Sequence, residues 1–330
     1  MGCPAGIGPE IIVRLFAGDS IWRPEPAYPV AVVGDIKTLG RAARTLGADV
    51  RFAAWQPGQN LTAGQIAVLQ VDNPGTDKLQ WGQPTAVCGQ ATASYIETAV
   101  SLILAGQASA LITCPISKFS LQQAGYAYPG HTEMLAALTG ADRVHMMMAG
   151  PRLKVVLVTI HEALKDVPAL LRPEAISACI HETHASLVRD FGCTRPRIAV
   201  AALNPHGGEQ GLFGDEEARI ITPAIDAVRN ELPQAELSGP WPPDSVFYQA
   251  VQGKFDVVIT MYHDQGLIPF KLLHFKDGVN VTLGLPIIRT SVDHGTAYDI
   301  AGKGLANADS LAAALDLART MASNRSAHEG

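Results

Sequence analysis

The sequence of 330 residues lacks the features that define several whole classes of protein. No apolar run approaches the roughly 18–20 uninterrupted residues that a membrane span needs, and the best candidate, 99–105, is short. Only 17% of the residues are charged while 47% are apolar, a balance that excludes a disordered chain and supplies a large core. The net charge of −6 argues against a nucleic-acid partner, because a nucleic-acid backbone is held by excess positive charge.

Cysteine is scarce and scattered. The five thiols, none of them in a C-x-x-C spacing, are Cys3, Cys88, Cys114, Cys179 and Cys193. They predict reduced thiols in a cytoplasmic protein rather than a disulfide framework or a zinc ribbon. The N-terminus has no basic segment followed by an apolar stretch, so no secretory signal is expected. The chain opens in a loop that enters a helix, and we expect that a short leading strand is missing from it.

Three common motifs are absent as well. The sequence contains neither G-x-G-x-x-G after an expected strand nor G-x-x-x-x-G-K-[ST], which disfavours an ordinary Rossmann or P-loop enzyme. It also has no G-x-S-x-G elbow, which argues against a serine hydrolase of that type.

Apolar runs rich in valine and isoleucine alternate with helical patterns along the chain. Strands are expected at 29–33, 66–71, 110–113, 154–159, 197–203, 256–262 and 280–283. Helices are expected at 90–105, 174–189, 215–230 and 310–323. This alternation predicts an α/β protein with largely parallel sheets, and the length predicts two lobes. Two proline-rich stretches, 22–29 and 239–243, are expected in turns.

Chemistry in such sheets collects in the loops that leave the carboxyl ends of the strands. Three of these loops carry a histidine shortly after the expected strand, namely His161, His206 and His263. Three imidazoles with an open fourth position suit a catalytic zinc, cobalt, nickel or iron ion. Because the three are far apart in sequence and match no local ligand motif, ordinary surface or core histidines remain the alternative.

A second set of side chains suits an anion. It combines cations with hydrogen-bonding groups and comprises His131, Thr132, Lys271, Asn280 and Arg289. Gly6 and Gly8 form a glycine turn before a proline, typical of a helix start that can hold an anion. Asp244 and Asp264 are acid/base candidates. Solvated charges, helix caps and plain turns are the ordinary structural alternatives for these residues.

Five motifs occur in order over nearly the whole chain. They are G-x-P-A-G-I-G-P-E at 2–10, P-G-H-T-E at 129–133, N-P-H-x-G-E at 204–209, M-Y-H-D-Q-G at 261–266 and R-T-S-x-D-H-G-T-A at 289–297. Together they resemble the 4-hydroxythreonine-4-phosphate dehydrogenase family of vitamin B6 synthesis. The stretch 294–304 is similar to the adenosine-side loop of isopropylmalate dehydrogenases, which implies a two-lobed isopropylmalate/isocitrate dehydrogenase-like α/β fold.

The resemblance implies two domains with different roles. A discontinuous cofactor-side domain would comprise 1–126 and about 291–330, and a metal, substrate and dimerisation domain would comprise about 127–290. The cofactor-side residues would be Gly6, Gly8, His294, Gly295 and Asp299. The metal ligands would be His161, His206 and His263, contributed by both chains of a homodimer with a shared active site. The substrate-binding residues would be His131, Thr132, Lys271, Asn280 and Arg289.

The resemblance also implies the reaction. NAD, or alternatively NADP, and one divalent zinc, magnesium or cobalt ion would support oxidation of a phosphorylated hydroxy acid, followed by decarboxylation. The expected substrate is 4-phosphooxy-L-threonine, which gives 2-amino-3-oxo-4-phosphooxybutanoate and then 3-amino-2-oxopropyl phosphate. Asp264 or Asp244 would help to take the hydroxyl proton, and Lys118 would carry a proton at decarboxylation. Lys271 and Arg289 would anchor the phosphate.

Three alternatives stay open. The stretches 268–273 and 277–280 resemble a branch that oxidises 4-phospho-D-erythronate or 4-phospho-D-threonate and gives dihydroxyacetone phosphate. A cis-dihydrodiol carboxylate dehydrogenase and a non-catalytic metal- or nucleotide-binding regulator are more distant. One position departs from the family pattern: Cys3 stands where the family usually has aspartate, which puts NAD affinity or substrate choice in question.

Overall fold

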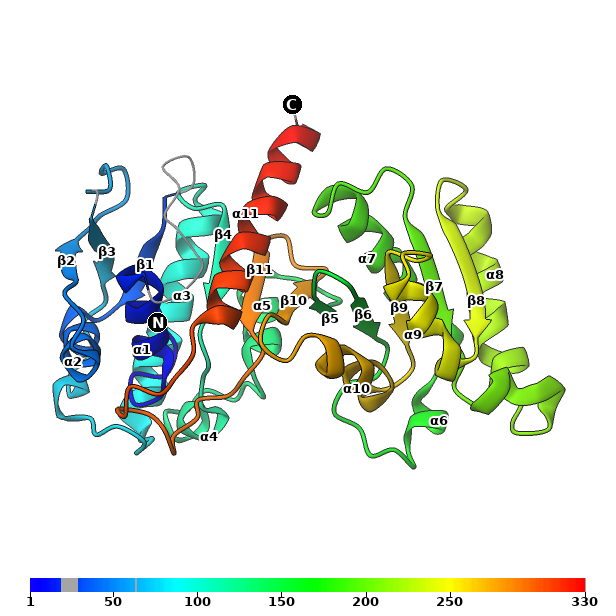
Figure 1. Ribbon diagram of the computed structural model, residues 1–330, viewed down its shortest axis with the longest axis horizontal. Helices are drawn as coiled ribbons and strands as arrows, with labels where there is room; N and C mark the ends of the chain where they lie inside the picture. The colour runs from blue at the N-terminus through cyan, green and yellow to red at the C-terminus, as the bar shows by residue number, and fades with distance from the viewer. Residues whose placement is uncertain (19–28, 63, 330) are drawn as a thin grey trace. The chain divides into compact units, whose positions relative to one another are not determined.

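The computed structural model describes residues 1–18, 29–62 and 64–329 (Figure 1). The chain divides into two compact units, Met1–Asp142 with Leu285–Arg319 and Arg143–Gly284 with Thr320–Gly330. Strands and helices alternate in both units, and most strand pairs are parallel. The α/β class with largely parallel sheets, predicted from the alternating patterns, is therefore confirmed.

Unit 1 contains two groups of parallel strands. The first is a three-stranded sheet in the order β1 (Ala31–Gly34), β3 (Gln65–Gln70) and β2 (Arg51–Ala54). The second pairs β4 (Ala110–Thr113) with β11 (Ile288–Val292), with Arg289 opposite Leu111. The helices are α1 (Gly8–Ala17), α2 (Ile36–Leu46), η1 (Thr76–Lys78), α3 (Ala86–Leu104), α4 (Lys118–Gln123) and α5 (His131–Thr139). The long α11 (Asp309–Glu329) begins in this unit.

The first two helices of unit 1 begin and end at residues suited to helix termini. Pro9 lies in the first turn of α1, where a missing N–H costs nothing, and Gly18 ends the helix with a left-handed φ of 86°. The Asp35 carboxylate caps α2 by accepting hydrogen bonds from the backbone of Lys37 and Thr38, each at 3.1 Å. Both helices bury their apolar faces in one core cluster with β1 and β3.

Unit 2 is built on strands in the order β10 (Val279–Leu283), β5 (His145–Ala149), β6 (Lys154–Leu157), β9 (Val257–Thr260), β7 (Arg197–Ala201) and β8 (Glu236–Trp241). The pairs β10·β5 and β5·β6 are antiparallel, whereas β6·β9, β9·β7 and β7·β8 are parallel. The helices are α6 (Val167–Leu170), α7 (Pro173–Arg189), η2 (Pro205–Gly211), η3 (Glu217–Ile221), α8 (Thr222–Glu231), α9 (Pro243–Val251) and α10 (His263–Leu273).

The core of unit 2 explains why its strands are continuous apolar runs. All four residues of β9 are buried, as expected for a strand covered on both faces. Val246 of α9 and Phe270 of α10 pack with Val155 and Val258 of the sheet in one buried cluster. Helices α7 and α8 pack on each other and contact strands of the same sheet.

The strands and helices expected from sequence are found, with end points that shift by a few residues. The turn expected at 239–243 is wrong for Gly239–Trp241, which belong to β8. A proline is tolerated there because β8 lies at the edge of the sheet, and the register with β7 is irregular beside it. The other proline-rich stretch, 22–29, lies outside the described residues except for Pro29.

The unit boundaries differ from those expected at 126 and 291. The segment 127–142 belongs to unit 1, because α5 packs on α3. The last turns of α11 belong to unit 2, where Asn324 Nδ2 donates to the Asp190 carbonyl at 2.8 Å and Arg325 Nε donates to the Asp190 carboxylate at 2.5 Å. Assignment of the units to cofactor and to metal stays a prediction.

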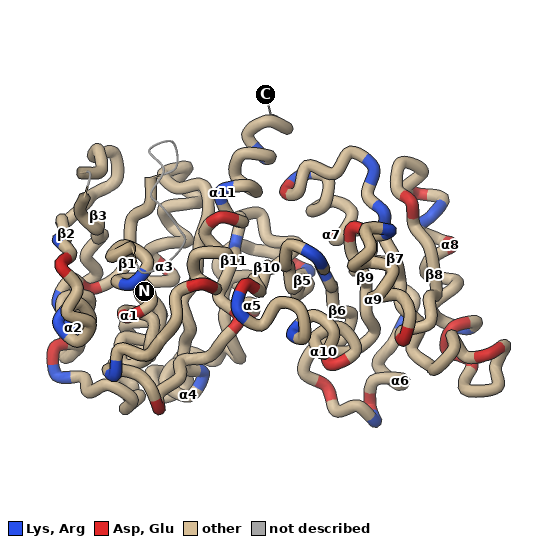
Figure 2. The backbone as a smooth tube through the Cα atoms, in the orientation of Figure 1, with Lys and Arg blue, Asp and Glu red and all other residues tan. Residues whose placement is uncertain are grey.

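Acidic and basic residues are interspersed over the elements of each unit (Figure 2). Among the described residues, no helix combines the length and the apolar character that crossing a membrane requires.

Candidate active site

The carboxyl ends of β6, β9 and β7 lie next to one another at one edge of the unit 2 sheet, because the three strands are adjacent and parallel. Backbone pairing continues beyond β6 and β9: Val158 N donates to the Thr260 carbonyl at 2.9 Å. Thr159 Oγ1 donates to the Met261 carbonyl at 2.7 Å. The loops that carry His161 and His263 are therefore held together by main-chain and side-chain hydrogen bonds.

His161 and His263 form a pair at this edge. Their ring centroids lie 5.9 Å apart, with the planes inclined by 37°. His263 Nδ1 lies 2.7 Å from Asp264 Oδ1. A carboxylate on Nδ1 orients the ring and makes Nε2 the more basic nitrogen, as is common for metal-binding histidines. Since a metal–nitrogen bond is about 2 Å long, two rings at this separation can reach the same ion.

Gln265 fixes this edge of the sheet from within. The side chain is buried, its Oε1 accepts from Met261 N at 2.7 Å, and its Nε2 donates to the Ala202 carbonyl at 2.7 Å. One amide thus connects the end of β9 to the end of β7. Sequence reasoning missed this role; the signal was a lone amide directly after the histidine and aspartate of M-Y-H-D-Q-G.

Among the described residues, His206 is not grouped with the pair in a three-residue metal site. Its φ is 54°, and the positive values continue through Gly207, Gly208, Glu209 and Gln210. A left-handed backbone conformation costs a non-glycine residue roughly 1–2 kcal/mol, so contacts with residues outside the loop must stabilise it. The imidazole contacts Phe213, with ring centroids 6.1 Å apart. Among the described residues of this one chain, no three His, Cys, Asp or Glu side chains are grouped as a metal site.

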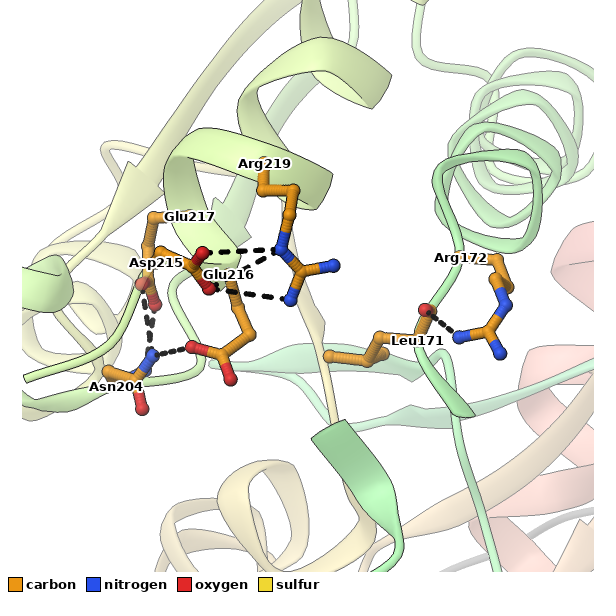
Figure 3. A network of polar contacts seen from close by, with 7 residues as sticks. All are labelled: Leu171, Arg172, Asn204, Asp215, Glu216, Glu217 and Arg219. Carbon is orange, nitrogen blue, oxygen red and sulfur yellow. Dashed lines mark hydrogen bonds and ion pairs between the residues drawn. The ribbon is translucent and has the colours of Figure 1, made fainter. Parts of the chain in front are cut away.

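Glu217 is the group that holds the His206 loop (Figure 3). Its buried carboxylate accepts the backbone N–H groups of Leu203 and Asn204, both at 2.8 Å, and the Asn204 side-chain amide at 3.0 Å. A Cβ atom on Gly208, whose φ is +80°, would lie 2.7 Å from Glu217 Oε2. Sequence reasoning missed Glu217, which resembles any solvated acid near the start of a helix.

Arg289 lies in β11 of unit 1 and is only 3% exposed. Its Nε and Nη2 donate to Thr113 Oγ1 at 3.1 and 2.8 Å. Burial lowers the pKa of the Arg289 guanidinium to about 10, against the opposing effect of Glu133. The group therefore remains a cation at neutral pH, held in a fixed orientation by the neighbouring strand β4.

His131, at the start of α5, lies near this cation. Its Nε2 is buried without a hydrogen-bond partner. Burial, then the charge of Arg289 and that of the Met1 ammonium, holds the pKa of His131 well below its usual value, so the ring is neutral at neutral pH. Lys118 is close by, since its Cε would lie 3.7 Å from a Cβ on Gly130. A buried cation, an unpartnered imidazole nitrogen and a lysine together suit an anion.

The expected cofactor-side residues also come together in unit 1. Ile7 N donates to the Thr296 carbonyl at 3.1 Å, and a Cβ on Gly6 would lie 3.1 Å from that same oxygen. The glycine turn therefore packs directly on the 294–304 loop. Gly302 N donates to the buried carboxylate of Glu10, which follows Gly8 by two residues. His294, Gly295 and Asp299 are exposed on that loop.

The remaining candidates belong to unit 2. Lys271 lies in α10, with Nζ 5.8 Å from the centre of the Phe275 ring. Asn280 lies in β10 opposite Met148, and Asp244 is exposed in the first turn of α9. The expected substrate residues are therefore divided between the units: His131, Thr132 and Arg289 belong to unit 1, and Lys271 and Asn280 to unit 2.

Comparison with known proteins identifies the family. The family model described as pyridoxal phosphate biosynthetic protein PdxA matches residues 26–318. A 4-hydroxythreonine-4-phosphate dehydrogenase of Desulfosudis oleivorans is 55% identical, covering 96% of this chain and 93% of its own. A protein of Oceanobacillus iheyensis, named provisionally as a D-threonate 4-phosphate dehydrogenase, is 42% identical over 98% of this chain and 96% of its own.

The solved structures agree. The crystal structure of a 4-hydroxythreonine-4-phosphate dehydrogenase from Klebsiella pneumoniae has a TM-score of 0.89 and 42% identity, covering 98% of this chain and 96% of its own. The family match spans most of the chain and includes the candidate metal-binding and anion-binding residues, whereas Gly6 and Gly8 precede it. The chain therefore belongs to the PdxA family of pyridoxal phosphate biosynthetic proteins.

Proposed function

We propose that the chain is an NAD-dependent, divalent-metal-dependent dehydrogenase that oxidises 4-phosphooxy-L-threonine to 2-amino-3-oxo-4-phosphooxybutanoate. Loss of carbon dioxide from this β-keto acid then gives 3-amino-2-oxopropyl phosphate. The observation that carries the proposal is the pairing of His161 with His263, 5.9 Å apart at the carboxyl edge of a parallel sheet. Family membership and the relatives named for this activity support it.

The pair in one chain supplies two of the three expected metal ligands. His161 and His263 would supply two imidazoles, and Asp264 would orient the second one through Nδ1. We propose that His206 of a partner subunit completes the set, which makes the enzyme a homodimer with a shared site. When bound, a divalent zinc, magnesium or cobalt ion supplies Lewis acidity toward the hydroxyl and carboxylate of the substrate.

The phosphate of the substrate would bind in unit 1. Arg289 is a buried cation already oriented by Thr113, so little is lost in fixing it when the anion arrives. The unpartnered Nε2 of His131 gains a hydrogen bond in the complex, and Thr132 adds a hydroxyl. We propose that Lys271 and Asn280 contribute the remaining contacts. These groups position the substrate and do not themselves take part in bond making.

Proton transfer requires groups close to the reacting carbons. We propose Asp244 or Asp264 as the group that helps to accept the hydroxyl proton, and Lys118 as the group that delivers one at decarboxylation. Asp264 Oδ1 lies 2.7 Å from His263 Nδ1, so the Asp264 carboxylate also orients this ring, whereas the Asp244 carboxylate is exposed. The glycine turn of Gly6 and Gly8 with His294, Gly295 and Asp299 would hold the dinucleotide, which would supply the hydride acceptor when bound.

A second candidate is oxidation of 4-phospho-D-threonate or 4-phospho-D-erythronate. The Oceanobacillus relative favours it, because it is named for D-threonate 4-phosphate and is still 42% identical. The two substrate classes differ in a hydroxyl or an amino group at one carbon, and both carry the terminal phosphate that Arg289 and His131 suit.

A substrate panel tests the proposal. The purified protein would be given NAD and a divalent ion with 4-phosphooxy-L-threonine, 4-phospho-D-threonate, 4-phospho-D-erythronate and the unphosphorylated forms, and formation of reduced nicotinamide would be followed. Fastest turnover of the amino compound, lost with a chelator, supports the main proposal. Preference for 4-phospho-D-threonate or 4-phospho-D-erythronate would shift the assignment to the second candidate, and equal rates without phosphate would refute the role of Arg289.

A further inference from the structure

Cys3 and Cys88 lie together in a small buried cluster of unit 1. The cluster also contains Ala5 and Leu79, and both cysteines are fully buried. Cys3 belongs to the loop before α1, where the family pattern has aspartate, and Cys88 is the third residue of α3. Two thiols from separate elements thus lie together, and the proposed dehydrogenase reaction gives neither of them a role.

The sulfur atoms are held by a set of polar contacts. The two thiols pack with Ala5 in one buried cluster, in which each thiol and the Ala5 backbone influence the acidity of the other thiol. Cys3 Sγ lies 3.3 Å from the Tyr298 hydroxyl, and Cys88 Sγ lies 3.7 Å from Thr85 Oγ1. The arrangement provides several donors for one negative charge, which is the environment that a thiolate requires.

The two thiols differ in acidity. The hydrogen bond from Cys3 lowers the pKa of Cys88, and the position of Cys88 in the first turn of a helix favours the thiolate as well. The same hydrogen bond and burial raise the pKa of Cys3, which therefore keeps its proton. One sulfur is a nucleophile and its neighbour is a protonated thiol in contact with it.

Both sulfurs lie one side chain below the surface. Thr85, which contacts Cys88, is exposed, and Tyr298, which contacts Cys3, is half-buried. Because both sulfurs are fully buried, Thr85 or Tyr298 must move aside for a small oxidant to reach them. The loop of Tyr298 is held to the glycine turn by the hydrogen bond from Ile7 to Thr296, so the cluster sits under two connected surface segments.

We propose that Cys3 and Cys88 form a reversible dithiol site that a small peroxide oxidises to a disulfide. The Cys88 thiolate attacks one peroxide oxygen, the O–O bond breaks, and hydroxide leaves and takes up a proton as water, so that Cys88 becomes a sulfenic acid. The Cys3 thiol then attacks this sulfur, forming the S–S bond and releasing a second water. Two thiols are oxidised by two electrons, and one peroxide is reduced to two waters.

The other cysteines provide internal controls. Burial raises the pKa of Cys114, and it raises the pKa of Cys179 to about 12. Cys193 is half-buried, and burial followed by the charge of Asp256 raises its pKa. These three remain protonated and are expected to stay reduced at a peroxide concentration that oxidises the pair.

The experiment counts thiols and maps the bond. The reduced protein would be treated with hydrogen peroxide, quenched and unfolded, and its free thiols titrated; the count should fall from the five of the untreated chain to three. Chymotryptic digestion, which cleaves at Tyr95 and so separates Cys88 from Cys114, should give a Cys3–Cys88 peptide pair by mass spectrometry. Dithiothreitol should restore all five thiols.

Variants assign the steps. Cys3→Ser should stop at a Cys88 sulfenic acid that dimedone captures, Cys88→Ser should keep its thiols, and Cys179→Ser should still lose two. The proposal is overturned if the wild-type protein keeps five thiols at a dose that oxidises a free low-pKa thiol, or if the bond joins other cysteines. Because the wild-type count and mapping need no substitution, a variant that fails to fold leaves the test intact.

Discussion

The carboxylate of Asp264 lies 2.7 Å from Nδ1 of His263, and the His263 ring is 5.9 Å from that of His161. The carboxylate therefore fixes one nitrogen of a ring whose other nitrogen is available for an ion shared with His161. A second pair of the same kind exists in unit 2, where His274 Nδ1 lies 3.1 Å from Asp277 Oδ1, but that ring is 2% exposed and its Nε2 accepts from Arg152 N. The His263–Asp264 pair thus leaves one ring nitrogen for an ion, whereas both ring nitrogens of His274 are occupied within the fold.

Asp264→Asn is expected to weaken divalent-ion binding by about 10–100-fold, the usual cost of losing a carboxylate behind a ligating histidine. His263→Ala should abolish binding at concentrations where the wild type is saturated. Isothermal titration with zinc, on protein freed of metal, measures both. Asp277→Asn is the matched control, because its histidine is buried and bonded on both nitrogens; equal losses in the two aspartate variants would contradict the assignment.

Most of the architecture was accessible from sequence because fully covered strands are continuous apolar runs. The strands expected at 110–113 and 197–203 are found as β4 and β7 for this reason. Helix α10 was not expected, since Pro269 lies inside it and interrupts the helical pattern. Strand β11 was missed because Arg289 stands among its buried residues, and only the partners in the fold make a buried arginine acceptable.

The candidate site was accessible from sequence only in part. The rule that chemistry follows strand ends selected His161 and His263, and they lie together. Glu217 and Gln265 were missed because their roles depend on backbone groups that only the folded loops present to them. Cys3 was singled out by its departure from the family pattern, but contact with Cys88 depends on folding across 85 residues of chain and has no signature in local spacing.

Glu217→Ala should loosen the His206 loop, because the Leu203 and Asn204 backbone groups lose a buried acceptor. Each unsatisfied buried group costs about 1–3 kcal/mol, so the free energy of unfolding should fall by roughly 2–5 kcal/mol. Chemical denaturation measures this change. The control is Asp215→Ala, which removes an exposed ion pair with Arg219 in the same segment and should cost less than about 1 kcal/mol (Figure 3). Similar losses in the two variants would contradict the role of Glu217.

Arg289→Met keeps the volume of the buried side chain and removes its charge. The proposed function predicts that KM for the phosphorylated substrate rises by about 100-fold or more, since a charge-assisted contact with a buried anion is worth several kcal/mol. Turnover of the unphosphorylated form should change much less. Steady-state kinetics with both substrates provides the comparison. Arg219→Met, which alters an exposed arginine, should leave both values as they are, and a uniform fall in kcat for both substrates would argue that Arg289 supports the fold instead.

The buried imidazole of His131 makes stability depend on pH. Burial and the charge of Arg289 place the pKa of His131 in the folded protein below the value of about 6.5 in the unfolded chain. As the pH falls through that value the unfolded chain binds a proton that the folded protein does not, so the free energy of unfolding decreases, by up to about 1.4 kcal/mol per pH unit. The contribution is fully present above the unfolded pKa and is lost below it.

His131→Asn removes this pH-dependent contribution to the free energy of unfolding. Denaturation of the wild type and the variant between about pH 7 and about pH 5 should show a shallower loss of stability in the variant. His145→Asn should act in the same direction, because burial lowers the pKa of His145 as well. The buried Glu10, whose pKa is raised by burial, has the opposite sign but is common to all three proteins and cancels in the comparison. Parallel pH profiles for the wild type and His131→Asn would mean that the ring accepts its proton in the folded state, and the proposed neutral partner for a phosphate would then be a second cation beside Arg289.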